Sequence, residues 1–259
     1  MSLQLFLLFV VLPYWAVAQQ SHYDVISYQL DLSVDIEDQS IAGSNCVKFH
    51  VLSETDSLQI SLANHFSIQR ITDGHKALDF SFHEDLITIH FAERLKINTI
   101  ASIVIYYKGK PQTAKDPPWD GGFVWAKDSL DRPWVGVSCE GIGASTWWPT
   151  KNDIGDKADS VHVNVSIPKT QDSLKVVCNG RLGDVIHQRD STTFEWTVNY
   201  PITNYNVTLN IGAYEQFNVA YFTEEGTSFS LDYYVLDYHR TQAKEHFKQV
   251  PIILQSFEH

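Results

Sequence analysis

The sequence contains one His-Glu pair, His83-Glu84, which could begin a zinc-binding motif. A hydrolase that holds zinc on a helix needs a second histidine four residues after the first, because those positions share one helix face. Ile87 occupies that position here. The alternation around His83 is also typical of a strand, in which residues i and i+4 lie roughly 13 Å apart. We therefore predict no metal ligand and no catalytic residue in this chain.

A second candidate for chemistry is Glu140, which ends the apolar run Trp134–Cys139 and enters a glycine-rich turn. A carboxylate at the edge of a buried strand costs free energy unless a cation pairs with it. That cation could be a lysine of this chain or a group on a ligand. The aromatic sequence Trp147-Trp148-Pro149 follows shortly after.

Strands are the elements that would position this carboxylate. Between Tyr28 and Ile36 apolar residues alternate with polar ones, which is the period-2 pattern of a half-buried strand. Similar segments recur at residues 41–52, 58–62, 80–82, 86–91, 100–107, 134–139, 160–167, 175–178, 192–198, 206–211 and 228–236. We predict an all-β fold, a large antiparallel β-sandwich or saddle.

Turn residues separate these strands. Asp73-Gly74 predicts a turn, and Asn179-Gly180 predicts a hairpin between the strands on either side of it. Residues 108–130 predict a long loop or a hairpin tip, because they are rich in proline and glycine and proline is excluded from central strands.

The end of the sequence changes to a helical period. One apolar face is formed by Ala243, Phe247, Val250, Leu254 and Phe257, at steps of four, three, four and three. A proline at position 251 should kink this helix or begin its second segment. Nothing in the sequence is obviously built to cover the apolar face, so we expect self-association or low solubility.

Composition excludes some classes of function. The net charge of -12, from 31 acidic and 19 basic residues, repels phosphate backbones and makes nucleic acid an unsuitable partner. The three cysteines, Cys46, Cys139 and Cys178, allow at most one disulfide and have no zinc-ribbon spacing. We expect them to be small buried apolar side chains.

The first 18 residues resemble a secretory signal. An apolar run from Leu5 to Leu12 precedes the small-residue pattern Ala16-Val17-Ala18 and is too short to span a bilayer. We expect cleavage and export to the periplasm or the extracellular space, with no membrane span left afterwards.

Several motifs together resemble the N-terminal domain of the M1 family of zinc aminopeptidases. In that family a strand ending in Gln or Glu leads to an aromatic-Pro pair, an acidic turn and a Lys-Ala pair. Here the matching residues are Ser138-Cys139-Glu140, Trp148-Pro149 and Asp156-Lys157-Ala158, and further matches lie at residues 23–43 and 200–214. The sequence departs from the family at residues 149–154, where the family often has Pro-Cys-x-Asp-Glu-Pro.

The resemblance implies that this chain contains one whole domain and the beginning of a second, with different roles in binding and catalysis. Residues 19–237 would form the β saddle, and residues 238–259 would begin the catalytic metallopeptidase domain. Glu140 would bind the free amino terminus of a peptide substrate. The zinc, the His-Glu-x-x-His helix and the Gly-x-Met-Glu-Asn loop would belong to that catalytic domain, the expected partner of the saddle in the same polypeptide.

Two alternatives stay open at this point. The chain could be a stand-alone peptide-binding module without catalysis. It could also be a carbohydrate-binding β-sandwich whose clustered tryptophans stack on sugars; these are Trp119, Trp125, Trp134, Trp147 and Trp148.

Overall fold

The computed structural model describes residues 22–117 and 119–258; the predicted signal segment, 1–18, lies outside them. Its largest sheet has seven strands in the order β12-β13-β10-β1-β2-β7-β4. In chain order these are β1 (Tyr23–Asp35), β2 (Ser40–Val51), β4 (Phe66–Thr72), β7 (Ile100–Gly109), β10 (Ser160–Pro168), β12 (Arg181–His187) and β13 (Ser191–Val198).

Three smaller sheets accompany it in the described part of the chain. A four-stranded sheet contains β8 (Gly122–Lys127), β9 (Pro133–Ser138), β11 (Lys175–Cys178) and β14 (Leu209–Gly212). A three-stranded sheet contains β3 (Thr55–Ser61), β5 (Asp79–His83) and β6 (Leu86–Leu95). The last sheet is the hairpin of β15 (Tyr214–Phe222) and β16 (Ser228–Leu236). The predicted all-β fold is confirmed.

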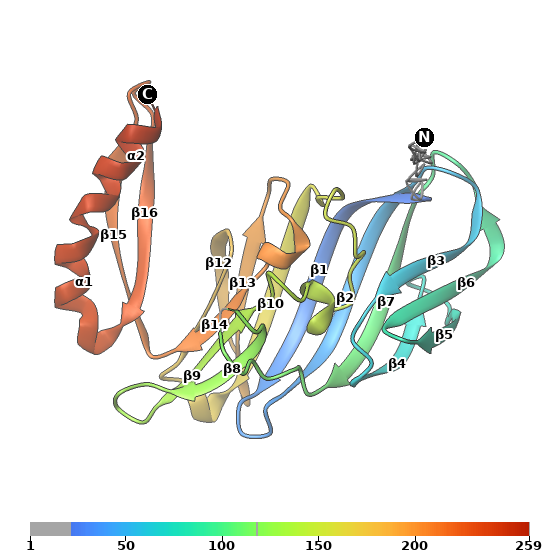
Figure 1. Ribbon diagram of the computed structural model, residues 1–259, viewed down its shortest axis with the longest axis horizontal. Coiled ribbons are helices and arrows are strands. Elements are labelled where there is room, and N and C mark those ends of the chain that lie inside the picture. Colours follow the sequence, from blue (N-terminus) through green and yellow to red (C-terminus); the bar gives the residue numbers. More distant parts are fainter. Residues whose placement is uncertain (1–21, 118, 259) are drawn as a thin grey trace, which may run out of the picture.

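Alternation within the long strands produces the core. Along β10 and β13 every second residue is buried, so these strands present one apolar face and one solvated face. Leu30 of β1 lies beside Val163 of β10 on the buried face. On the other face, the side-chain amide of Asn164 donates a 2.7 Å hydrogen bond to Asp31. The four-stranded sheet lies on the β10–β13 side and the three-stranded sheet on the β7–β4 side (Figure 1).

Three details differ from the sequence-based expectations. The pair β1–β10 is parallel, in a sheet that is otherwise antiparallel. The predicted loop at 108–130 contains β8, which pairs with β9. Asn179-Gly180 does not close a hairpin, since β11 pairs with β14 and β12 pairs with β13. At this turn the chain changes sheets, with Gly180 at φ 86° and packed against the carbonyl of Thr197.

The C-terminal segment forms two short helices. The 3₁₀ turn η4 (Asp237–His239) leads into α1 (Arg240–His246), and η5 (Phe247–Gln249) separates it from α2 (Val250–Glu258). Pro251 is the second residue of α2, so the predicted start of a second helical segment is confirmed. Among the described residues, no helix is long and apolar enough to cross a membrane.

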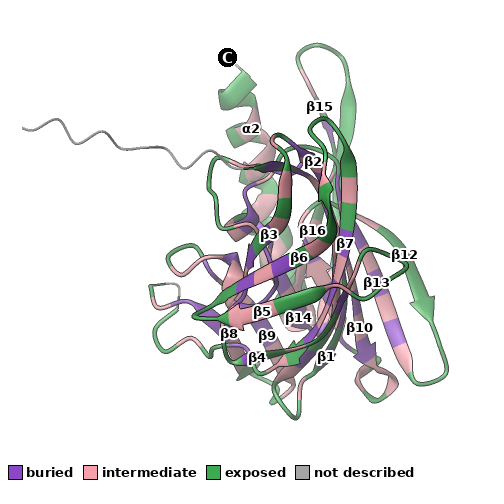
Figure 2. Ribbon diagram, turned by 90° about the vertical axis from the view of Figure 1, so that its right-hand side faces the viewer, coloured by how far each residue is buried: buried purple, intermediate pink, exposed green. Residues whose placement is uncertain are grey.

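The prediction that nothing covers the helical face is wrong in part. The ring of Phe247 stacks on Tyr233 at 4.9 Å and on Phe217 at 6.4 Å, both from the β15–β16 hairpin. The hairpin and the two helices stand together at one end of the molecule (Figure 1), while much of their outer surface is exposed (Figure 2). Phe257 is 83% exposed. The domain boundary at residues 237–238 stays a prediction.

An ion-pair cluster fastens this hairpin–helix unit to the saddle. Arg132, from the turn between β8 and β9, donates hydrogen bonds of 2.7 and 2.6 Å to the two carboxylate oxygens of Asp237. It also donates a 2.8 Å hydrogen bond to Asp128. Because a planar guanidinium that binds two carboxylates restricts their relative orientation as well as their separation, Arg132 holds Asp237 in a defined position relative to Asp128. Arg132 therefore helps to fix the position of the unit, together with the backbone N–H of Ser129, which donates to the Tyr238 hydroxyl at 3.3 Å, and the ring of Trp196, which packs on Tyr234 at 5.7 Å.

Candidate functional site

Glu140 lies in the turn that joins β9 to η1 (Ala144–Thr146). The backbone N–H of Gly143 donates a 2.8 Å hydrogen bond to the carbonyl of Cys139, which closes this turn. Glu140 itself is exposed, whereas its neighbour Cys139 is buried. No other described residue makes a hydrogen bond or an ion pair with the Glu140 carboxylate, so of the two cations considered above, a lysine of this part of the chain is excluded.

The strand side of the turn is held by packing. The thiol of Cys139 donates to the carbonyl of Tyr205 at 3.1 Å, and burial raises the pKa of this thiol to about 11. Gly121 lies against the other flank, because a Cβ there would sit 2.6 Å from the carbonyl of Ser138 and 2.8 Å from Ile142. Only a glycine allows these two segments to approach so closely.

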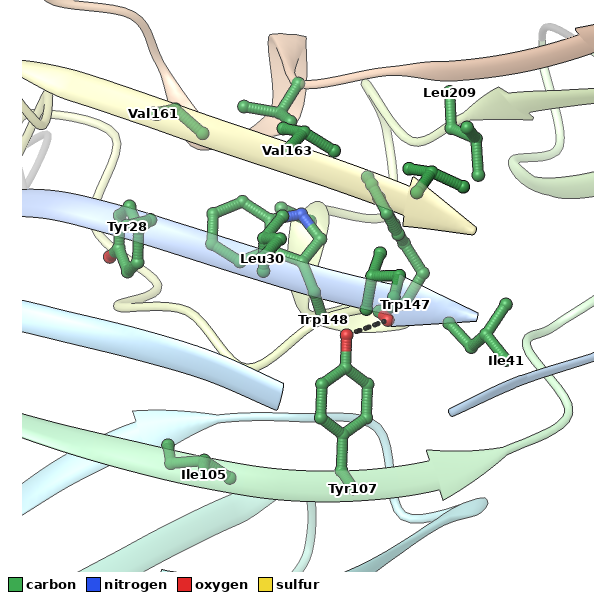
Figure 3. Close-up of a cluster of buried hydrophobic side chains, with 14 of the residues drawn as sticks. Tyr28, Leu30, Ile41, Ile105, Tyr107, Trp147, Trp148, Val161, Val163 and Leu209 are labelled. Atoms are coloured by element: carbon green, nitrogen blue, oxygen red, sulfur yellow. Dashed lines mark hydrogen bonds between the residues drawn. The ribbon is translucent and has the colours of Figure 1, made fainter. Parts of the chain in front are cut away.

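The other side of the turn is held by two buried tryptophans. Trp147 and Trp148 are 1% and 0% exposed, and they lie among the core side chains of the large sheet (Figure 3). The hydroxyl of Tyr107 donates to the carbonyl of Trp147 at 3.3 Å. The ring of Tyr28 meets Trp148 edge-on at 4.8 Å. The aromatic pair therefore anchors the segment that follows Glu140.

Buried polar contacts extend this anchor across the next residues. The side-chain amide of Asn45 donates a 2.6 Å hydrogen bond to the carbonyl of Pro149. Ser61 and Thr150 exchange two backbone hydrogen bonds of 2.9 Å. The amide of Asn204 donates to the carbonyl of Lys151 at 2.7 Å. Because buried polar groups are costly to leave unpaired, each contact restricts the path of the chain.

The acidic turn that follows Pro149 contains its own cation, Lys151. Lys151 forms a short ion pair with Asp156 and donates a 2.8 Å hydrogen bond to the carbonyl of Tyr23. Burial raises the pKa of Asp156, although the adjacent ammonium of Lys151 acts in the opposite direction. Lys151 is therefore committed to a structural pair. Residues 149–154, which depart from the family pattern, therefore form a turn that is held by several hydrogen bonds and an ion pair.

The described residues do not fit a metal. They contain no group of three or more His, Cys, Asp or Glu side chains that could hold an ion. His83 ends β5, and Glu84 follows it in the hairpin turn at φ 48°, so the two do not lie on a helix. A polar cleft of 580 Å³ is lined by Tyr23, Gln59 and Lys151 among others, but not by Glu140.

The clustered tryptophans separate into three groups by exposure. Trp147 and Trp148 are core residues, Trp125 and Trp134 are half-buried, and Trp119 is 85% exposed. Trp147 and Trp148 are therefore not available for stacking on sugars. The sequence showed that the cluster exists, but not which members face solvent.

Comparison with known proteins gives a fold. No family model matches the sequence, and no curated protein matches it. Among solved structures, a two-domain M1 zinc metallopeptidase bound to L-tryptophan matches with a TM-score of 0.70 and 16% identity. The match covers 82% of this chain and 48% of that one. An M1 zinc metallopeptidase from Deinococcus radiodurans matches equally well, over 47% of its length.

The chain has the fold of part of an M1 zinc metallopeptidase. It spans about half the length of the structures that it matches. A form of the Deinococcus radiodurans enzyme bound to the substrate Tyr-Ser-Ala has the same TM-score of 0.70. The structural likeness agrees with the sequence resemblance, although identity is only 16%.

Sequence reasoning identified the turn at Glu140 and missed its supports. Asn45, Tyr107 and Asn204 come from strands or turns far away in sequence, and each binds a carbonyl or backbone group of the segment after the turn. Asn45 was the one detectable signal, because it is a polar residue in the apolar face of β2.

Proposed function

We propose that this chain is the N-terminal, non-catalytic portion of an exported M1 zinc metallo-aminopeptidase. The observation that carries the proposal is the match of 82% of the chain to under half of a two-domain M1 zinc metallopeptidase. The sequence motifs around Glu140 support the same conclusion independently. In this proposal the saddle packs on a catalytic domain that begins near residue 238.

Glu140 would bind the amino terminus of the peptide. A free amino terminus is an ammonium, and the Glu140 carboxylate, which has no partner among the described residues, can accept its hydrogen bonds. The turn is fixed on both sides by buried contacts, so little ordering is needed when the ligand binds. Such a contact would place the first peptide bond at a defined position, which is the contribution of positioning to catalysis.

Zinc would supply an activated water and polarise the scissile carbonyl. The described residues contain no cluster that fits this ion, so we assign it to the catalytic domain. This chain contributes binding and orientation only.

The test is hydrolysis of a panel of aminoacyl chromogenic substrates, with the zinc content measured in the same samples. We expect neither activity nor stoichiometric zinc for the 259-residue chain, and both for the longer polypeptide that carries a catalytic domain. Activity with bound zinc in the 259-residue chain would contradict the proposal.

The export of the protein is a separate proposal, supported by the signal-like pattern of residues 1–18. Amino-terminal sequencing of the protein from its source would show processing near Ala18. An intact Met1 in the mature protein would overturn this part.

The two non-catalytic alternatives have weaker support. A sugar-binding platform would need exposed indoles, and two of the five clustered tryptophans are fully buried. A stand-alone peptide-binding module would bind peptides as the 259-residue chain, and a longer polypeptide would not hydrolyse them.

A further inference from the structure

The hairpin turn between β5 and β6 consists of two residues with positive φ, and neither is glycine. Glu84 has φ 48° and Asp85 has φ 66°, and the strands on either side pair up to His83 and Leu86. Two-residue turns of this kind usually have glycine at the second position, because side chains are strained at positive φ. The side chain at position 85 therefore occupies a place where glycine would be less strained, and we looked for a contact that glycine could not make.

Asp85 binds the chain just after β3 at two points. Its carboxylate accepts a 2.6 Å hydrogen bond from the backbone N–H of Asn64, and its carbonyl accepts a 2.9 Å hydrogen bond from the N–H of Leu62. A hydrogen bond to an ionised carboxylate is shorter and stronger than one between neutral groups. The residue between these two, Ala63, is therefore held from both sides.

Ala63 in turn holds the segment that follows Glu140. Its N–H donates a 2.8 Å hydrogen bond to the carbonyl of Ser145 in η1. The hydroxyl of the next residue, Thr146, donates to the carbonyl of Gly143 at 2.7 Å. The N–H of Gly143 makes the hydrogen bond that closes the Glu140 turn. A series of hydrogen bonds thus joins the β5–β6 turn to the turn that carries Glu140.

The Glu140 turn is therefore supported from two small sheets. On its β9 side the thiol of Cys139 donates to the carbonyl of Tyr205, which follows the four-stranded sheet's β11 and precedes its β14. On its η1 side the support comes from the three-stranded sheet, which lies on the β7–β4 side of the molecule (Figure 1). The exposed Glu140 carboxylate makes no contact of its own with the described residues, so its position depends on these supports.

We propose that Asp85 is a positioning residue: through Ala63 and Ser145, its carboxylate holds the Glu140 turn in the geometry that binds the amino terminus of a peptide. This inference rests on the proposed function. A misplacement of about 1 Å caused by a distant change can lower a rate up to about a hundredfold. Loss of one support should therefore weaken binding at Glu140 even though Glu140 is still present.

Three variants isolate this role. Asp85→Gly removes the carboxylate and suits the positive φ, so it adds no strain to the turn. Asp85→Asn keeps a side-chain carbonyl oxygen that can accept from the N–H of Asn64, and it loses only the charge. Asp73→Gly is the matched control, because the Asp73 carboxylate also accepts backbone N–H groups in an exposed turn, at 3.0 Å from His75 and 2.7 Å from Lys76.

The structural half of the proposal is measured by hydrogen exchange on the 259-residue chain. Asp85→Gly should speed exchange of the Ala63 and Gly143 amides roughly fivefold or more, the effect of losing one hydrogen bond. Asp85→Asn and Asp73→Gly should leave both amides within about twofold of wild type. Unchanged exchange in Asp85→Gly would overturn the proposal.

The functional half is measured on the full-length, zinc-loaded polypeptide with aminoacyl chromogenic substrates. Asp85→Gly should raise KM roughly fivefold, by no more than Glu140→Ala does, and Asp85→Asn should restore it. In the Glu140→Ala background Asp85→Gly should add no further loss, because it acts through Glu140. Additive losses, or an Asp85→Asn variant as impaired as Asp85→Gly, would overturn the proposal. If Glu140→Ala impairs hydrolysis and Asp85→Gly does not, only the positioning role fails; if Glu140→Ala is silent, the proposed function fails.

Discussion

Replacing Trp148 by alanine tests whether the segment after Glu140 is anchored in the core. Trp148 is 0% exposed and packs edge-on against Tyr28 and against Trp147. Burial of 150–250 Å² at about 25 cal/mol per Å² gives roughly 4–6 kcal/mol. Buried Trp→Ala substitutions cost about 3–5 kcal/mol. We therefore expect Trp148→Ala to lower the free energy of unfolding by about 3–5 kcal/mol.

Two further variants sharpen the measurement. Trp148→Phe should cost clearly less than Trp148→Ala, since it keeps a ring in the core and removes an indole N–H that lacks a hydrogen-bond partner among the described residues. Trp119→Ala should change the unfolding free energy by no more than about 0.5 kcal/mol, because its side chain is already exposed.

The assay is urea unfolding followed by near-ultraviolet circular dichroism, together with thermal unfolding. For a domain of this size each kcal/mol corresponds to about 2–4 °C, so Tm should fall by roughly 6–20 °C in Trp148→Ala. A loss below about 1 kcal/mol for Trp148→Ala, or equal losses for Trp148→Ala and Trp119→Ala, would refute the assignment of Trp148 to the core.

Two other predictions concern the fastening of the hairpin–helix unit and the thiols. Arg132→Ala should speed amide exchange in β15, β16 and the helices by roughly tenfold or more, because two charge-assisted contacts are lost. Equal exchange in wild type and variant would contradict this role. The guanidinium of Arg132 lowers the pKa of Asp237, so this contact stabilises the fold above the ordinary carboxylate pKa of about 4 and weakens as pH falls through the lowered value. After correction for the intrinsic pH dependence of amide exchange, the protection of amides in the wild-type unit should therefore fall at acid pH, and protection in the variant should depend less on pH. For the thiols, alkylation of the native protein at pH 8 should modify the half-buried Cys46 first, while Cys139 and Cys178 react only after unfolding, since burial raises their pKa values. Fast labelling of either buried thiol would show that the core opens readily.

The strands were predictable because their burial follows local periodicity. Apolar and polar residues alternate around Leu30 in the sequence, and buried and exposed residues alternate in the same way along β1 in the structure. Which strands pair with one another was harder to predict from the sequence. The parallel pair β1–β10 joins residues 133 positions apart, such as Leu30 and Val163. Asn179-Gly180 has the composition of a hairpin turn, although its flanking strands enter different sheets. Turn chemistry fixes local conformation but not which strand comes next to which.

The candidate site shows the same limit. The sequence placed Glu140 at the end of a strand and in a glycine-rich turn, which the structure confirms. It could not show that Lys151 is already paired with Asp156, nor that Trp119 is exposed while Trp148 is buried. Those properties depend on distant strands and their packing, and no local pattern records them.

The most direct test of the account is a comparison of Glu140→Ala with wild type in the full-length, zinc-loaded polypeptide. Glu140 is exposed and has no partner among the described residues, so its loss should leave the unfolding free energy within about 0.5 kcal/mol. The account predicts a raised KM and a fall in kcat/KM of roughly tenfold or more for substrates with free amino termini, the effect of losing one charge-assisted contact. Unchanged kinetics in a stably folded variant would contradict the central claim that Glu140 binds the amino terminus.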